Sequence, residues 1–187
     1  MKFLKFLLII FISINSPIKA DSNQNIINEL KRGGNLIFIR HAYAPGGGDP
    51  KNFDIKDCKT QRNLSNSGRN QAKKIGTYFK ENNIPISKVY SSEWCRCKET
   101  ASIAFNNFET KRFLNSFFSS QFAKNKDPQI KNFKNFIKNW NEDSNLIFVT
   151  HYVVINELLN YNPNSGEIVI SDRNYNIIGN LTISTNE

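Results

Sequence analysis

The chain contains two histidines, His41 and His151, and both follow a short apolar run. The two runs, residues 35–40 and 145–150, are nearly identical and are rich in Leu, Ile, Phe and Val, which is typical of strands buried on both faces of a parallel sheet. In open α/β sheets the carboxyl ends of such strands carry the ligand site. A single histidine there is more often a core residue. Two at matching strand ends predict a pair of imidazoles in one functional site.

Two arginines lie beside these histidines in the predicted arrangement. Arg40 directly precedes His41, and Arg96 comes shortly after another predicted strand that ends at Ser91-Ser92. Guanidinium groups stay charged at physiological pH, and their forks match the oxygen atoms of a phosphoryl group. Because neither arginine has a carboxylate at a fixed spacing, we expect a bound anion to balance their charge. The alternative is a pair of surface arginines.

The elements that must position these residues alternate between strand and helix. Strands are expected near residues 35–40, 88–92, 112–114, 145–150, 167–170 and 176–183. Helices are expected over about 23–32, 67–80, 94–104 and 153–159, and a lysine-rich helix follows Asp127. This order predicts an α/β fold, a three-layer sandwich with a mostly parallel central sheet and helices on both faces.

A long irregular stretch, residues 42–62, follows the first predicted strand. It contains the run Pro45-Gly46-Gly47-Gly48-Asp49-Pro50, whose glycines and prolines do not fit regular structure. A stretch of this length in a compact domain is usually functional or disordered. The glycines lack the spacing of a P-loop, so we expect them to form turns.

The amino-terminal residues have the pattern of a secretory signal peptide. Two lysines precede the apolar run 6–12, and Ala20 provides a small residue before a cut. The run is too short for a membrane span, which needs about 20 residues. We therefore expect residues 1–20 to be a signal peptide and residues 21–187 to be a single domain, periplasmic or secreted, with no stable membrane insertion. The alternative is an uncleaved amino-terminal anchor.

The chain is basic, with a net charge of +9. Three lysines lie in the predicted signal peptide, so its removal would leave +6, which favours anionic ligands in general. The densest lysine cluster lies opposite an apolar stripe, Ile130, Phe133, Ile137 and Trp140, and is expected to be a solvated helix face. No recognised nucleic-acid-binding motif accompanies it, so nucleic acid is not an expected partner.

Three cysteines, Cys58, Cys95 and Cys97, are an odd number for an oxidising compartment. Cys95 and Cys97 are poor partners for each other, because helix residues two apart point in different directions. A bridge from Cys58 to one of them would stabilise the fold by about 4 kcal/mol on the chain-entropy model. Three unbridged core thiols are the alternative. A zinc site is not expected, since no cysteine pair has zinc-finger spacing.

Four motifs in this sequence resemble those of the histidine phosphatase superfamily, branch 1, also called phosphoglycerate-mutase-like. Arg40-His41-Ala42 resembles the family's Arg-His-Gly, and residues 64–72 resemble its Leu-Thr-x-x-Gly-x-x-Gln-Ala helix start. Residues 91–101 match its Ser-x-x-x-Arg-x-x-x-Thr-Ala pattern, and His151 after an apolar strand matches its second histidine. The resemblance follows the family's order and covers nearly the whole predicted domain.

The resemblance implies phosphoryl transfer through a covalent phosphohistidine on His41. A neutral imidazole attacks phosphorus in line, and one difficult transfer becomes two easier ones. Arg40 and Arg96 would hold the phosphoryl oxygens and neutralise developing charge, while His151 would add a third donor. Neither a metal nor a cofactor is implied. Tyr152, which replaces a small residue of the family pattern, is expected to narrow the pocket or to stack on a substrate.

The general acid is where this chain departs most from the family. Many members carry a Glu after the third strand, whereas residues 115–120 contain none. Glu93, which lies between the strand end and Arg96, is the candidate acid, and the alternative is a favourable charge at a helix amino terminus. Protonation of an alkoxide leaving group is worth about 10²–10⁴-fold in rate, so its absence favours substrates with better leaving groups.

These observations predict a phosphatase that hydrolyses phosphomonoesters or similar phosphoryl compounds. Small or activated phosphates, a phosphorylated envelope component, or phosphohistidine on another protein are the expected substrates and partners. A phospho-ligand-binding module of the cell envelope with weak turnover is the alternative. The four residues Arg40, His41, Arg96 and His151 together argue against it, because anion binding needs no nucleophile. The sequence makes no prediction about oligomeric state.

Overall fold

A computed structural model describes residues 18–141 and 143–185 of the chain. The predicted signal peptide therefore lies almost entirely outside the described residues. The first helix, α1 (Ile18–Arg32), includes the expected boundary at residue 21, which stays a prediction. Within the described residues no helix is long and apolar enough to cross a membrane.

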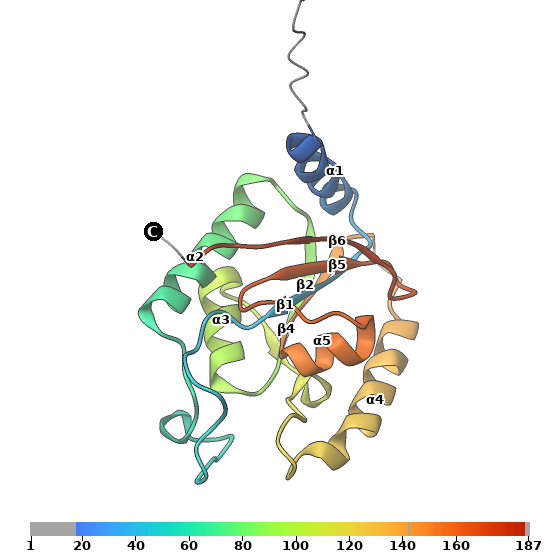
Figure 1. The fold of residues 1–187 in the computed structure, drawn as a ribbon. Coiled ribbons are helices and arrows are strands. Elements are labelled where there is room, and N and C mark those ends of the chain that lie inside the picture. Colours follow the sequence, from blue (N-terminus) through green and yellow to red (C-terminus); the bar gives the residue numbers. More distant parts are fainter. Residues whose placement is uncertain (1–17, 142, 186–187) are drawn as a thin grey trace, which may run out of the picture.

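The described fold is built on one six-stranded sheet (Figure 1). Its strands are β1 (Leu36–Arg40), β2 (Ile86–Ser91), β3 (Glu109–Thr110), β4 (Asn145–Thr150), β5 (Ile168–Ser171) and β6 (Ile177–Leu181). They lie in the order β3-β2-β4-β1-β5-β6. The first four are mutually parallel, while β5 runs antiparallel to β1, and β6 antiparallel to β5. The mostly parallel sheet that the sequence predicts is confirmed.

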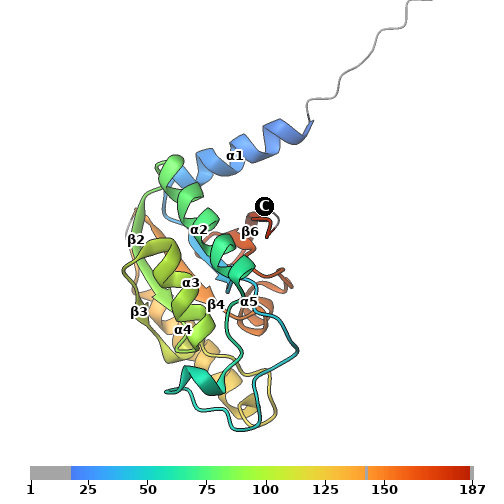
Figure 2. The same cartoon turned by 90° about the vertical axis from the view of Figure 1, so that its left-hand side faces the viewer.

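Helices cover both faces of this sheet (Figures 1 and 2). They are α2 (Asn66–Glu81) and α3 (Cys95–Phe105) on one face, and α4 (Lys126–Lys138) and α5 (Tyr152–Leu159) on the other. Alternating strand residues supply two separate cores: Ile37 and Ile39 pack with α2 and α3, while Leu36 and Phe38 pack with α4 and α5. The three-layer α/β sandwich is therefore confirmed.

The two histidine strands lie side by side at the centre of the sheet. Each residue of β1 pairs with its counterpart in β4, from Leu36 with Leu146 to Arg40 with Thr150. Asn145 at the start of β4 accepts hydrogen bonds from both the backbone N–H and the side-chain amide of Asn35, which helps to fix this register. Equal register means that the next residue in each chain segment emerges at the same edge of the sheet.

Two predicted elements differ from the structure. The strand expected at residues 112–114 is a 3-10 turn, Arg112–Leu114, and the short edge strand β3 lies just before it. Leu114 is fully buried, so its apolar character reflects core packing and not strand pairing. The first helix is longer than the expected 23–32 and ends, as expected, where Gly33 and Gly34 adopt positive φ.

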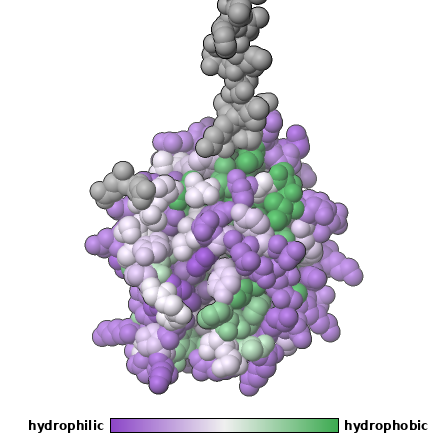
Figure 3. All heavy atoms as spheres, in the orientation of Figure 1, coloured by the Kyte–Doolittle hydropathy of each residue, from purple (hydrophilic) through white to green (hydrophobic). Residues whose placement is uncertain are grey.

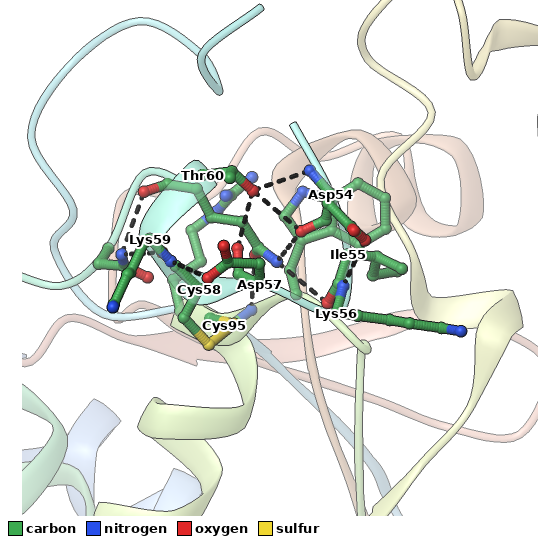
Figure 4. The surroundings of a disulfide bond; sticks show 12 residues. Asp54, Ile55, Lys56, Asp57, Cys58, Lys59, Thr60 and Cys95 are labelled. Atoms are coloured by element: carbon green, nitrogen blue, oxygen red, sulfur yellow. Dashed lines mark hydrogen bonds between the residues drawn. A yellow bond between two sulfur atoms is a disulfide. The ribbon is translucent and has the colours of Figure 1, made fainter. Parts of the chain in front are cut away.

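A disulfide joins Cys58 in the long loop to Cys95, the first residue of α3 (Figure 4). The loop around Cys58 forms a short 3-10 turn in which Asp57 accepts from the backbone N–H of Lys59. Cys97 is a buried free thiol, and burial raises its pKa to about 12. The arrangement of one bridge and one free thiol is confirmed, and the alternative of three unbridged thiols is wrong.

The surface seen in Figure 3 is mostly hydrophilic, with separate smaller hydrophobic areas. On α4, Phe133 and Ile137 are buried, and Ile130 and Trp140 pack against the same core. Lys131, Lys134 and Lys138 of that helix are exposed, and Lys126 in its first turn is half-buried. The predicted division of this helix into an apolar stripe and a solvated basic face is confirmed.

Candidate active site

His41 follows β1 directly, and its imidazole is almost entirely buried, with 2% exposed. Its Nδ1 lies 2.8 Å from the carbonyl oxygen of Ala42. A carbonyl only accepts, so Nδ1 carries the proton and Nε2 keeps a free lone pair. The ring centroid lies 5.6 Å from that of His151, which confirms that the two strands bring their histidines to one site.

Residues of the recognised motifs hold the chain immediately after His41. The backbone N–H of Ala42 donates to the Thr100 hydroxyl of α3 at 3.0 Å. The backbone N–H of Tyr43 donates to the Gln71 amide oxygen of α2 at 2.9 Å. A Cβ at Gly68 would lie 2.0 Å from the Tyr43 carbonyl, so only glycine permits this approach. Helix residues thus fix the backbone whose carbonyl orients the His41 ring.

His151 follows β4 and is held by hydrogen bonds of defined direction. Its Nε2 lies 2.9 Å from the Ser92 hydroxyl, which itself donates to the side-chain oxygen of Asn115 at 3.1 Å. The Ser92 oxygen therefore accepts from Nε2–H. The other nitrogen, Nδ1, lies 3.5 Å from Nη2 of Arg96, which can only donate. The two histidines are thus opposite tautomers, and His151 turns an acceptor toward Arg96.

Glu93 does not line the cavity that contains His41. Its carboxylate instead accepts a hydrogen bond of 2.6 Å from the side-chain amide of Asn115 and borders a neighbouring hollow. Because a carboxylate only accepts, this bond orients the Asn115 amide so that its oxygen faces Ser92. Glu93 therefore lies at the far end of a hydrogen-bonded chain that runs from His151 through Ser92 and Asn115. This position does not match the acid role expected from the sequence.

Three arginines line the same cavity as the two histidines: Arg40, Arg62 and Arg96. Each has a buried Nε without a hydrogen-bond partner. Burial and the charge of Arg96 lower the pKa of Arg40 and of Arg62 from the ordinary value. Buried donors without partners are rare because they carry a desolvation cost, so this cluster has the character of an anion-binding site.

Asp49 from the glycine-rich loop pairs with Arg96 and corrects one expectation. Its two carboxylate oxygens lie 2.8 and 3.3 Å from Nη1 and Nη2 of Arg96, and Trp94 donates to it at 3.0 Å. Burial acts to raise the Asp49 pKa, but hydrogen bonds from Arg96, Arg62 and Trp94 bring it below its ordinary value. A protein carboxylate, and not only a bound anion, therefore balances the Arg96 charge.

Both histidines are neutral in this environment. Burial, followed by the charge of Arg96, holds the pKa of His41 well below 6.5, and the same two causes act on His151. A low pKa keeps the Nε2 lone pair of His41 available at neutral pH. Three guanidiniums and one carboxylate leave a net charge of two positive, which matches a phosphoryl dianion.

The cavity has a volume of about 370 Å³, which is within the range of small-molecule sites. One wall consists of strand-end residues, and the other comes from the loop at residues 46–62 and the segment 116–122. The glycine run, interpreted from the sequence as turns, lines the cavity beside Asp49. Among the described residues, no group of three or more His, Cys, Asp or Glu is arranged to hold a metal.

Arg62 and Asp49 are the site residues that the sequence analysis missed. Both lie in the irregular stretch between β1 and α2, where no periodic pattern fixes the direction of a side chain. The nearest signal is the position of Arg62, two residues before the Leu64–Ala72 motif that resembles the family pattern. Arg40, His41, Arg96 and His151 are brought together as expected.

The family model described as the histidine phosphatase superfamily (branch 1) matches residues 36–115. This segment contains Arg40, His41, Arg62 and Arg96 but not His151. A curated relative, the mitochondrial serine/threonine-protein phosphatase Pgam5 of Drosophila grimshawi, is 32% identical over 105 residues. That match covers 52% of this chain, and the chain spans about a third (34%) of the length of that relative.

Solved structures share the fold at lower sequence identity. Phosphoglycerate mutase from Thermus thermophilus is similar with a TM-score of 0.56 at 13% identity, covering 80% of this chain and 99% of that one. The protein histidine phosphatase SixA complexed with tungstate also has a TM-score of 0.56 at 13% identity, covering 79% and 96%. The family model for the histidine phosphatase superfamily (branch 1) thus matches residues 36–115 of this chain, and the fold of these two solved structures is shared over about four fifths of its length.

Proposed function

We propose that this protein is a phosphatase that works through a covalent phosphohistidine on His41. The observation that carries the proposal is the His41 ring, whose Nδ1–H is fixed on the Ala42 carbonyl at 2.8 Å. Nε2, which keeps its lone pair, is therefore the reactive atom. The ring lines a cavity together with three arginines whose buried Nε atoms have no hydrogen-bond partner. A nucleophile beside such a cluster of cations suits phosphoryl transfer better than anion binding alone.

The reaction proceeds in two steps. In the first, Nε2 of His41 forms a bond to phosphorus while the bond from phosphorus to the leaving group breaks, and the leaving group departs with the electron pair. In the second, water attacks the phosphohistidine, releases phosphate and restores the neutral ring. The guanidiniums of Arg40, Arg62 and Arg96 hold the phosphoryl oxygens through both steps and stabilise the developing charge.

His151 contributes by positioning Arg96. In the described structure its Nδ1 accepts from Arg96 at 3.5 Å, so in this tautomer it is not the third donor that the resemblance implies. Asp49 accepts from both Nη atoms of the same guanidinium. Together they fix the direction of the Arg96 fork before a substrate arrives, which is the preorganisation that electrostatic catalysis requires.

The test is release of inorganic phosphate from acetyl phosphate and from 4-nitrophenyl phosphate, measured in EDTA with the parent protein and the His41→Ala variant. We expect the variant to lose at least about 10⁴-fold in rate, because the nucleophile is gone. Lys131→Ala, on the exposed face of α4, is the matched control and should retain parent activity. Equal rates for parent and His41→Ala would overturn the mechanism.

Trapping the intermediate gives a second readout. A rapid quench during turnover should show an acid-labile phosphate bound to the protein. Because the chain has two histidines, mass spectrometry assigns it to His41 or His151 without ambiguity. Binding of phosphate without turnover or labelling would support the phospho-ligand-binding alternative.

We also propose that the mature protein is exported and acts on a phosphorylated small molecule or envelope component. The signal-like residues 1–20 and the Cys58–Cys95 bridge support this location, since disulfides persist in oxidising compartments. Amino-terminal sequencing of the protein recovered from the periplasm or the medium should begin at Asp21. Recovery of the uncut chain from the cytosol would contradict the proposal.

A further inference from the structure

The mouth of the cavity carries an aromatic surface that the phosphoryl-transfer steps leave unused. Phe118 lines the cavity, yet 61% of its surface is exposed, the most among the large hydrophobic residues that the structure describes. Its ring centroid lies 5.8 Å from that of Tyr152, which also lines the cavity. From these contacts, and resting on the proposed function, we infer that the protein selects aryl phosphomonoesters, whose phenolic ring packs against Phe118 and Tyr152.

The aromatic surface is joined directly to the phosphoryl site. The guanidinium carbon of Arg40 lies 5.3 Å from the ring centroid of Tyr152, a cation–π arrangement. Arg40 holds the phosphoryl group on one side and the Tyr152 ring on the other. A ring attached to that phosphoryl group through one oxygen atom therefore meets Tyr152 and Phe118 first. The open surface of Phe118 offers an offset or edge contact, the arrangement that aromatic pairs prefer.

The polar groups around the leaving-group side favour the same substrate class. The segment after the 3-10 turn Arg112–Leu114 contributes Ser116, Phe118, Ser119, Gln121 and Phe122 to the cavity, and none of these side chains is an acid. Asp49 is the one carboxylate among the described lining residues. Its lowered pKa and its pairing with Arg96 keep it ionised, so it holds no proton to give.

A cavity whose one lining carboxylate is ionised and paired with an arginine discriminates by leaving group. An alkyl phosphate would release an alkoxide, a strong base that needs protonation in the transition state. An aryl phosphate releases a phenolate, whose conjugate acid has a pKa near 10, as for a tyrosine side chain. In the inferred reaction Nε2 of His41 bonds to phosphorus, the aryl oxygen leaves as phenolate, and the phenolate takes its proton from water outside the site.

The first experiment compares one aromatic and one non-aromatic substrate, neither of which releases an alkoxide. The ratio of kcat/KM for phenyl phosphate to that for acetyl phosphate is measured for the parent, Phe118→Ala and Phe118→Trp. We expect the ratio to fall about tenfold in Phe118→Ala, since an aromatic pair contributes on that order, and to recover in Phe118→Trp. Ile178→Ala removes an exposed apolar side chain on β6, outside the cavity, and should leave the ratio unchanged.

A ratio that is unchanged in Phe118→Ala would overturn the inference. Because acetyl phosphate has no ring, its hydrolysis by the parent would show that the phosphatase proposal stands on its own even then. Hydrolysis of 2-glycerophosphate as fast as phenyl phosphate would also overturn the inference, because an alkoxide would then leave without difficulty.

Further substrates in the same assay show whether the aryl phosphate belongs to a small molecule or to a protein. Phenyl phosphate and free phosphotyrosine represent small molecules, and a phosphotyrosyl peptide represents a protein substrate. Higher kcat/KM for the peptide assigns the aryl group to a protein, and higher values for the free compounds assign it to a small molecule. Phosphoserine in the same peptide is the alkyl control, and we expect it to be hydrolysed at least about 10²-fold more slowly.

Discussion

The two walls of the cavity are built from different kinds of structure and do different work. The strand-end wall consists of Arg40 at the end of β1, His41 directly after it, Arg96 in the first turn of α3, and His151 after β4. Its two imidazoles are almost fully buried and neutral. The loop wall, from residues 46–62 and 116–122, carries a balancing carboxylate, an additional arginine and an exposed aromatic ring.

The strand-end wall therefore carries the groups for phosphoryl transfer, and the loop wall carries groups that can select the substrate. The register of β1 and β4 fixes Arg40, His41 and His151 relative to each other, so the nucleophile and the arginine beside it are set by the core of the fold. The loop wall adjusts net charge through Asp49 and Arg62 and presents Phe118 to whatever the phosphoryl group is attached to. Loops on a rigid scaffold are where substrate preference usually varies.

The largest effect should come from the strand-end wall. Arg96→Ala removes a guanidinium that lines the cavity and whose two Nη atoms are held in place by Asp49. We expect kcat/KM for acetyl phosphate to fall about 10³-fold in this variant. Arg69→Ala is the matched control, because Arg69 pairs with Glu99 on the partly exposed surface of α2 and α3. A similar loss of kcat/KM in both variants would mean that the loss comes from the change in net charge and not from the position of Arg96 in the site.

The titratable groups of the two walls should lose their contributions to protein stability in different pH ranges. The fold lowers the pKa of both histidines below 6.5, so it favours their neutral forms; their contribution is complete above pH 6.5 and is lost as pH falls below that value. The Asp49 pKa is lowered from 3.8, so its contribution is complete above pH 3.8 and is lost as pH falls further. Between pH 3.8 and pH 6.5 the histidines therefore account for most of the change in stability that these three groups cause.

Denaturant unfolding at a series of pH values measures this difference. Below pH 6.5 the free energy of unfolding should fall by up to about 1.4 kcal/mol per pH unit for each buried histidine. His151→Gln should remove one histidine contribution to the slope, whereas Asp49→Asn should leave it unchanged above about pH 4.5. An identical slope for the parent and His151→Gln would refute the buried neutral state of His151.

The smallest effect is expected at Glu93, which is outside both walls. Glu93→Gln keeps an oxygen that accepts from Asn115, so kcat/KM for phenyl phosphate should change less than about threefold. An acid in the reaction would instead contribute about 10²–10⁴-fold, chiefly for poor leaving groups. A loss of that size with an alkyl phosphate would return Glu93 to the role suggested by the sequence.

The features predicted correctly from the sequence are those that a repeating pattern controls. Apolar runs before His41 and His151 predict central strands, and equal strand ends place the imidazoles together. The order of strands and helices limits the fold to a three-layer sandwich. Each of these predictions depends on regular backbone geometry, which a local sequence can specify.

The features that were missed depend on loops or on contacts between distant residues. Asp49 reaches Arg96 across 47 positions of sequence, and no spacing rule connects a loop carboxylate to a helix guanidinium. Glu93 follows a strand end, but Asn115, which is 22 positions later, decides where its carboxylate points. Residues 112–114 resemble a strand because Leu114 is a core residue, although its backbone forms a turn.

The disulfide also has a consequence for how the site forms during folding. Cys58 precedes Arg62 by four residues, and Cys95 precedes Arg96 by one, so the bridge is a covalent link between the two arginines. A denatured chain with its bridge intact still keeps these guanidiniums within a few residues of one cross-link. Refolding of such a chain begins with two of the three anion-binding side chains already neighbours, and the histidines join them only when β1 and β4 pair.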